Sequence, residues 1–254
     1  MENKNWQFGD LLEEGLEKLN LDKTDGCKYK RSSILTLLRK YIEEIELFNE
    51  AYGLVKVIDR RELIVKHILD SLAPLGMIFK SLPDFNNRQT SGQFSGNAGS
   101  VDSTGIVPKS LEIADAGSGA GLPGIPLAIC LPETEFTLIE RMGRRAGFLR
   151  NCIAVLGISN IRVEEKEMEK AIPGRFDLAV FRAFRPLEPV ILKGLFRLLK
   201  PGGFLAAWKG RIESSREEML KAEKSFPGLK WEIQPVTVPF LEEERCLTFI
   251  LPGS

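Results

Sequence analysis

A turn rich in glycine and proline, ADAGSGAGLPGIP at residues 114–126, is the part of the sequence best suited to hold a ligand. It contains four glycines and two prolines in thirteen positions. Glycine weakens a helix or strand by about 1 kcal/mol per position, and proline removes a backbone donor. Such a concentration indicates a turn whose backbone closely approaches another molecule, although on this stretch alone a tight strand-to-helix turn stays possible.

Polar residues follow the strands that the pattern predicts, and in a doubly wound sheet ligands bind beyond the carboxyl ends of the strands. We expect these strand-end residues to converge on one edge: Asp115, Gly117, Gly119 and Gly121, then Glu140, then Met168 and Glu169, then Arg182, and finally Lys209. Each has an ordinary alternative when taken alone. Asp115 could cap the turn, and Met168 could be core. Arg182 could be a structural arginine paired to a core carboxylate such as Asp177, and Glu140, Glu169 and Lys209 could be solvated.

Two ligands fit the glycine turn. The stretch GAGLPG (119–124) matches G-x-G-x-x-G, and Glu140 lies at a suitable distance to bind a ribose hydroxyl, so a dinucleotide is a competitor. A pyrophosphate, however, needs free N–H groups at the start of the helix. Pro123 and Pro126 remove two of these donors. S-adenosylmethionine has a ribose but no phosphate, so the sequence favours S-adenosylmethionine.

Strand and helix patterns alternate through the second half of the chain. The predicted strands are 111–116, 135–140, a short one from 161, 176–183, 203–209, 230–238 and 245–251, with helices from 126, at 144–157, 187–200 and 212–225. This alternation predicts an α/β, Rossmann-like, mostly parallel seven-stranded sheet. Only PFLEEE separates the regions of the last two strands, which favours an antiparallel pair.

The first part of the chain differs in pattern. Apolar residues at three- and four-residue spacing predict helices through residues 7–80. Residues 81–109 are dominated by Gly, Ser, Asn, Gln and Thr, which predicts a long flexible loop. We therefore expect a helical segment (1–80), a polar loop (81–109) and an S-adenosylmethionine-binding domain (110–254), with the helices and the domain packed as one unit.

Composition narrows the function classes. The 35 basic and 35 acidic residues give a net charge of zero, which argues against a strongly basic, nonspecific nucleic-acid binder. The four cysteines are far apart, so neither a zinc site nor a disulfide framework is predicted. The start of the sequence lacks the pattern of a signal peptide, and no run is long enough to cross a membrane. We expect a cytoplasmic protein without a metal.

The reactive groups that are missing also carry information. The position after the fourth strand holds FRAFRP, where amino-group methyltransferases of nucleic acids commonly carry an Asn/Asp-Pro-Pro-aromatic run. No cysteine follows a proline, as carbon-5 methylation of pyrimidines usually requires, and the single histidine, His67, is expected to be structural. This inventory suits a reaction without a general base or covalent intermediate, such as attack of a purine N7 lone pair on a sulfonium methyl group.

Several stretches together resemble the ribosomal RNA small-subunit methyltransferase G family, also called GidB. They are FNEAYGLVKVIDRRELIVKHILDSL (48–72), DAGSGAGLPGIPLAI (115–129), TLIERMGRRAGFLR (137–150), FRAFRPL (181–187) and WKG (208–210). The resemblance implies a class I S-adenosylmethionine-dependent fold and methylation of guanine N7 in bacterial 16S ribosomal RNA. In the family the cofactor contacts residues that match Gly117, Leu122, Met168, Glu169 and Arg182 here.

A set of basic residues is expected at the same edge and predicts RNA contacts: Arg141, Arg144, Arg145, Arg185 and Arg211, within a basic rim that also includes Arg150 and Lys209. Arg182 and Lys209 are the predicted catalytic residues, through ordering of cofactor and base. The predicted partner is small-subunit ribosomal RNA or the small ribosomal subunit, without DNA and with the protein as a monomer. A small-molecule or protein methyltransferase, a noncatalytic binding protein and a nicotinamide-dependent oxidoreductase stay open as alternatives.

Overall fold

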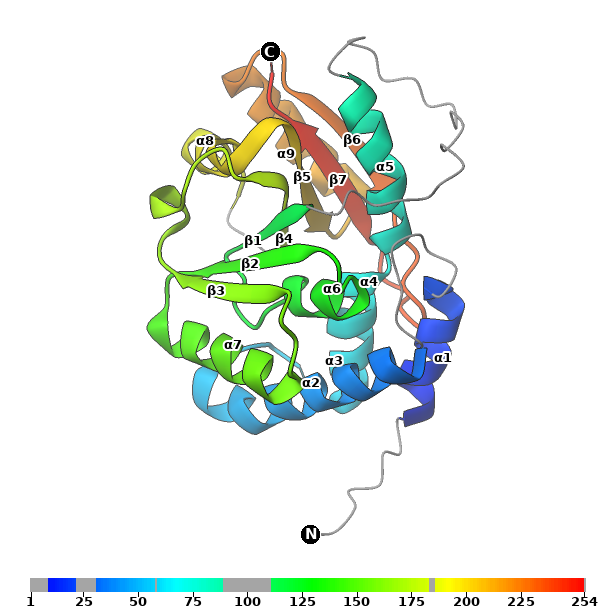
Figure 1. Cartoon of the computed structure of the whole chain (residues 1–254). Helices are drawn as coiled ribbons and strands as arrows, with labels where there is room; N and C mark the ends of the chain where they lie inside the picture. The colour runs from blue at the N-terminus through cyan, green and yellow to red at the C-terminus, as the bar shows by residue number, and fades with distance from the viewer. Residues whose placement is uncertain (1–8, 22–30, 58, 89–110, 183–185, 254) are drawn as a thin grey trace.

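The computed structural model describes residues 9–21, 31–57, 59–88, 111–182 and 186–253, and Figure 1 shows their arrangement. A seven-stranded sheet forms its centre, in the order β3-β2-β1-β4-β5-β7-β6. The strands are β1 Glu112–Ala116, β2 Glu135–Glu140, β3 Ile161–Glu165, β4 Phe176–Arg182, β5 Leu199–Lys209, β6 Lys230–Pro235 and β7 Cys246–Leu251.

The pairing matches the sequence-based prediction. The strands β3, β2, β1, β4 and β5 pair in parallel, whereas β7 is antiparallel to both β5 and β6. Parallel strands need a crossover connection, which the intervening helices supply. The predicted fold, a mostly parallel Rossmann-like sheet with an antiparallel last pair, is confirmed.

Two apolar cores lie on the two faces of the sheet, because successive strand residues point to opposite faces. In β1, Ile113 belongs to one core and Ala114 to the other. The first core contains α6 (Gly124–Cys130), α7 (Gly143–Leu156) and the N-terminal helices. The second contains α8 (Pro189–Leu198) and α9 (Ile212–Ser225). The carboxyl ends of β1 and β2 lie between the helices that cover the two faces of the sheet.

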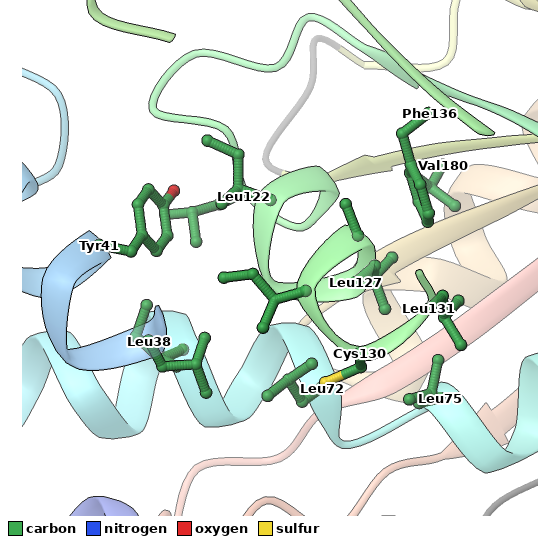
Figure 2. Packing of buried hydrophobic residues seen from close by; sticks show 14 of the residues in the cluster. Leu38, Tyr41, Leu72, Leu75, Leu122, Leu127, Cys130, Leu131, Phe136 and Val180 are labelled. Atoms are coloured by element: carbon green, nitrogen blue, oxygen red, sulfur yellow. The ribbon is translucent and has the colours of Figure 1, made fainter. Parts of the chain in front are cut away.

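The N-terminal helices share the first core with the sheet. They are α1 Gly9–Leu19, α2 Arg31–Tyr52, α3 Arg60–Leu63, the π-helical turn η2 Ile64–Leu69, α4 Asp70–Leu72 and α5 Leu75–Arg88. Figure 2 shows Leu38 and Tyr41 of α2, Leu72 of α4 and Leu127 of α6 in one cluster. The amphipathic spacing therefore places these helices against α6 rather than leaving them as a separate bundle. No helix in the described part of the chain has the length and hydropathy needed to cross a membrane.

Two local predictions are corrected. The loop expected from residue 81 does not begin there, because α5 continues to Arg88; Leu82 and Phe85 extend the apolar spacing of the helix in the sequence. Residues 89–110 lie outside the described residues. The strand expected at 203–209 begins earlier, at Leu199, so that residues 201–203 lie inside β5 as an irregularity where the pairing register with β4 shifts. Gly202 adopts a φ of 80°, which favours glycine.

Candidate functional site

A cavity of about 430 Å³ opens at the carboxyl ends of β1 and β2. Its volume lies within the range of about 300–1,000 Å³ that is usual for small-molecule sites. In the sheet, β1 lies between β2 and β4, so the strand order reverses at β1. Doubly wound sheets bind ligands at such a reversal, and the cavity lies next to it. Its walls are Gly117, Ile139, Glu140, Arg141, Met142, Arg145, Lys166, Glu167, Met168, Glu169 and Ile191.

The glycine turn contributes Gly117 to the wall of this cavity and has a backbone conformation that other residues rarely adopt. Gly117, Gly119 and Gly121 have φ values of 71°, 57° and 92°. The Gly121 N–H donates to the Ser118 carbonyl at 2.7 Å, and the Ser118 hydroxyl donates to the Asp115 carbonyl at 2.8 Å. These three glycines are required because a side chain is strained at positive φ.

Glu140 connects the turn to the cavity. One of its carboxylate oxygens, Oε2, accepts from the Gly119 N–H at 2.9 Å, and Oε1 accepts from the Met142 N–H at 2.8 Å. The residue is only 4% exposed, yet it lines the cavity. Each oxygen has two lone pairs, so each can accept a further bond from a ligand hydroxyl. Glu140 thus lines the cavity at the sheet edge where the sequence placed it, and its contact with a ligand stays a prediction.

Asp115 lies behind the turn and is not among the cavity-lining residues. Its Oδ2 accepts from the Gly124 N–H at 2.9 Å, and the residue is 1% exposed. Burial raises the pKa of Asp115 to about 7, and the bond from Gly124 partly opposes this shift. Asp115 thus holds the turn, which is the alternative that the sequence left open for it.

The start of α6 has no N–H group to offer a phosphate. The Gly124 N–H donates to Asp115, the Ile125 N–H donates to the Gly121 carbonyl at 2.8 Å, and Pro123 and Pro126 have no N–H. Pyrophosphate binding in dinucleotide folds depends on such donors. As the sequence predicted, the structure therefore has no free N–H donors at the start of α6. Their absence disfavours a dinucleotide as the ligand.

The loop after β3 forms the wall opposite the glycine turn. It contains a 3-10 turn, Met168–Lys170, that brings both Met168 and Glu169 to the cavity, as predicted. Met168 is 6% exposed and packs against α8, where a Cβ at Gly194 would lie 2.7 Å from its Cε. Gly194 thus makes room for Met168.

Five lining residues are absent from the predicted set: Ile139, Met142, Lys166, Glu167 and Ile191. Four of them are next to, or within two residues of, predicted positions, so their place in the sequence could have indicated them. Ile191 comes from α8, and only the packing of that helix brings it to the cavity. Gly119, Gly121 and Leu122 were predicted but do not line the cavity. Leu122 is 5% exposed in the core, and a Cβ on Gly121 would meet Ile125 at 2.5 Å.

Arg182, at the end of β4, points into a buried polar cluster of the N-terminal helices and is not a lining residue. Its Nη1 donates to the Lys66 carbonyl and to Asp70 Oδ2, both at 3.0 Å. Its Nη2 lies 2.7 Å from His67 Nδ1. The carboxylate that balances the charge of Arg182 is thus Asp70 from the N-terminal segment. Direct contact between Arg182 and a cofactor stays a prediction.

Two further groups complete this cluster. The Arg245 Nε lies 3.3 Å from the second carboxylate oxygen of Asp70, and the Trp208 indole N–H donates to the Asp70 carbonyl at 3.0 Å. Burial, and after it the charge of Arg182, lowers the pKa of His67 to about 3. His67 is therefore neutral and accepts from Arg182, which fits the structural role expected for it.

Lys209, the other predicted catalytic residue, is engaged elsewhere. Its Nζ lies 2.7 Å from Glu218 Oε2, and Lys209 does not line the cavity. Glu218 also accepts from the Leu187 N–H at 3.0 Å, after the segment 183–185. Lys209 and Glu218 are thus linked to the backbone of Leu187, before α8, and a catalytic role for Lys209 stays a prediction.

The predicted basic residues fall into three groups. Arg141 and Arg145 line the cavity, and the Arg144 guanidinium lies 5.7 Å from the centre of the Tyr52 ring. Arg211 is exposed at the start of α9. Arg185 lies outside the described residues. Within the described residues, no carboxylate forms an ion pair with any of four of these arginines: Arg141, Arg144, Arg145 and Arg211. Arg150 of α7, in contrast, pairs with Glu165 at 2.8 Å.

Comparisons with known proteins give one consistent family. A family model described as GidB, rRNA small subunit methyltransferase G, matches residues 100–248. A protein named ribosomal RNA small subunit methyltransferase G from Treponema denticola is 36% identical over 249 residues, which are 95% of each chain. Proteins of the same name from Treponema pallidum (strain Nichols) and Xanthomonas axonopodis pv. citri are 35% and 33% identical, over 94% and 95% of this chain and 92% and 94% of theirs.

Among solved structures, an S-adenosylmethionine-dependent methyltransferase from Aquifex aeolicus has a TM-score of 0.46 and 19% identity. The match covers 55% of this chain and 81% of that chain.

Proposed function

The chain belongs to the rRNA small subunit methyltransferase G family, and on that premise we propose that it methylates guanine N7 in 16S ribosomal RNA, with S-adenosylmethionine as the methyl donor. It acts in the cytoplasm as a monomer, on small-subunit ribosomal RNA or the assembled small subunit. The proposal combines the family with the chemistry of the cavity.

The observation that carries the choice of cofactor is the contrast between Glu140 and α6. Glu140 presents a carboxylate that two backbone N–H groups hold at the cavity wall, which suits the two hydroxyls of a ribose. The start of α6 has its N–H groups already bonded or replaced by proline, which suits a ligand without phosphate. The residues present therefore fit an adenosyl group attached to an amino acid.

The apolar part of the cavity supports the same ligand. Ile139, Met168 and Ile191 line it from three different elements, and their side chains suit the faces of an adenine ring. The cavity side of Gly117 has no side chain, so a ligand can approach its backbone closely. These contacts would orient the donor without any metal ligand.

The reaction needs orientation more than proton transfer. When bound, S-adenosylmethionine supplies a methyl group on a cationic sulfonium, and its transfer to the N7 lone pair leaves a neutral thioether and a cationic guanine ring. Guanine N7 carries no proton, so the protein does not have to remove one. Holding two reactants in line can supply several kcal/mol of the barrier. In this chain the oriented Glu140 and the arginines beside it are the groups placed to do so.

The basic residues at the mouth of the cavity support RNA as the substrate. Arg141 and Arg145 line the cavity and Arg144 lies next to them on α7, without carboxylate partners among the described residues. Phosphate contacts position a nucleic acid and need cations whose charge no neighbouring carboxylate neutralises. Because the whole protein has a net charge of zero, this basicity is local to the site.

The decisive experiment incubates the protein with methyl-labelled S-adenosylmethionine and with 16S ribosomal RNA, or small subunits, from a strain lacking the enzyme. We expect labelled N7-methylguanine after digestion to nucleosides. Label at another base position would refute the N7 assignment, and label only in protein or a small molecule would favour a different methyltransferase. With no label in any ribosomal substrate, the protein would be a noncatalytic binder.

A further inference from the structure

Tyr41 links the N-terminal helices directly to the glycine turn. It lies in the middle of α2, is 0% exposed, and its hydroxyl donates to the Ala120 carbonyl at 2.6 Å, across 79 residues of sequence. Figure 2 shows the ring of Tyr41 beside Leu122 in the apolar cluster. A buried polar group needs a partner, and here the partner is a backbone carbonyl of the glycine turn.

The bond from Tyr41 acts on a peptide of the turn that is held at both of its polar groups. Ala120 lies between Gly119 and Gly121, which both have positive φ. The peptide that joins Ala120 to Gly121 is held at its carbonyl by Tyr41 and at its N–H by the Ser118 carbonyl, 2.7 Å away. Both polar groups of this peptide are therefore engaged, which opposes rotation of the peptide plane.

The orientation of the turn is passed on to the cavity through Glu140. The residue before Ala120, Gly119, donates its N–H to Glu140 Oε2 at 2.9 Å. A turn that rotates would lose this bond and release one oxygen of the carboxylate. Burial raises the pKa of Tyr41 well above its ordinary value, so its hydroxyl stays a donor at every working pH.

We propose that Tyr41 is a positioning residue for the cofactor, which holds the glycine turn and Glu140 in the binding conformation before the ligand arrives. The inference rests on the proposed function, since it names the same cavity. Its physical basis is preorganisation: the apparent affinity equals the intrinsic affinity multiplied by the fraction of molecules whose site is in the binding-competent state. The N-terminal helices would thus set cofactor affinity without contacting the cofactor.

The test is Tyr41→Phe, which removes one oxygen and keeps the ring. We expect the Kd for S-adenosylhomocysteine, measured by calorimetry, and the KM for S-adenosylmethionine to rise about 5- to 10-fold, with kcat retained at saturating cofactor. The matched control is Thr248→Val, which removes a buried hydroxyl bonded to Ser215 at 2.7 Å, away from the turn. It should lower stability similarly and leave Kd and KM unchanged.

The outcomes separate the two proposals. If the wild-type protein binds no S-adenosylhomocysteine, the proposed function fails. If the wild type binds and Tyr41→Phe binds equally well, or loses kcat with an unchanged KM, the positioning role is wrong. Should the variant not fold, amide hydrogen exchange on the ligand-free wild type decides instead. We expect the Gly119 and Gly121 amides to be protected, and exchange at unprotected rates would overturn the inference.

Discussion

The guanidinium of Arg182 and the carboxylate of Asp70 form a buried ion pair of 3.0 Å across 112 residues of sequence. Their side chains are 13% and 6% exposed. Removing one partner of such a pair leaves an uncompensated buried charge and costs about 3–5 kcal/mol. The pair therefore ties the end of β4, next to the cavity, to the N-terminal helices.

Arg182→Lys keeps the charge and loses the planar fork that reaches Asp70, His67 and the Lys66 carbonyl. We expect the free energy of unfolding to fall by about 1–3 kcal/mol, because buried acceptors lose their donors. The melting temperature should fall by about 2–10 °C, measured by calorimetry. Arg211→Lys, at an exposed position, is the control and should melt like the wild type. An unchanged melting temperature with lost methyl transfer would instead place Arg182 in the reaction site.

His67 should not titrate in the neutral range. Burial and the adjacent Arg182 lower its pKa from 6.5 to about 3, so the unfolded chain binds more protons than the folded protein between these values. This contribution to stability is complete above pH 6.5 and is lost as the pH falls toward 3. Because the sequence has one histidine, its imidazole resonances in an NMR titration are unambiguous. We expect no shift between pH 8 and pH 5, and a midpoint near 6.5 would contradict the buried acceptor role.

Glu140→Gln should weaken cofactor binding. Both carboxylate oxygens accept backbone N–H bonds, and the amide of glutamine would put an NH2 group against one of these donors. We expect the Kd for S-adenosylhomocysteine to rise at least about 10-fold, which corresponds to about 1.4 kcal/mol. Glu135→Gln at the exposed start of the same strand is the control and should bind normally. Equal affinities for both variants would remove Glu140 from the ligand site.

The arginines at the mouth of the cavity should set the salt dependence of RNA binding. Each phosphate contact contributes about 0.7–0.9 to the slope of log K against log salt concentration. We expect Arg141→Ala and Arg144→Ala each to reduce the slope by about that amount in filter binding to 16S ribosomal RNA. Arg150→Ala is the matched control on the same helix, because Arg150 already pairs with Glu165. A slope changed equally by all three variants would point to a general charge effect.

Much of the site could be predicted because it depends on local patterns and on one rule of geometry. Parallel strands end at a common edge, so Glu140, Gly117 and the pair Met168–Glu169 are brought together once the strands are identified. The same reasoning does not reach Ile191, because the sequence does not indicate which turn of α8 faces the cavity. It also misjudged the end of α5 and the glycines inside β5, where tertiary pairing outweighed local turn preference.

By itself, the sequence determined the order of strands and helices, the glycine turn with its blocked helix start, and the family, because these depend on residue type and short spacing. Only the tertiary structure decided the partners of Arg182 and the bond from Tyr41 to Ala120, which join residues 112 and 79 positions apart. Periodicity shows that α2 and η2 have a buried face, but not which backbone atoms that face meets. That choice is made by the packing of the N-terminal helices on α6 and the sheet, where each buried polar group must find its donor or acceptor.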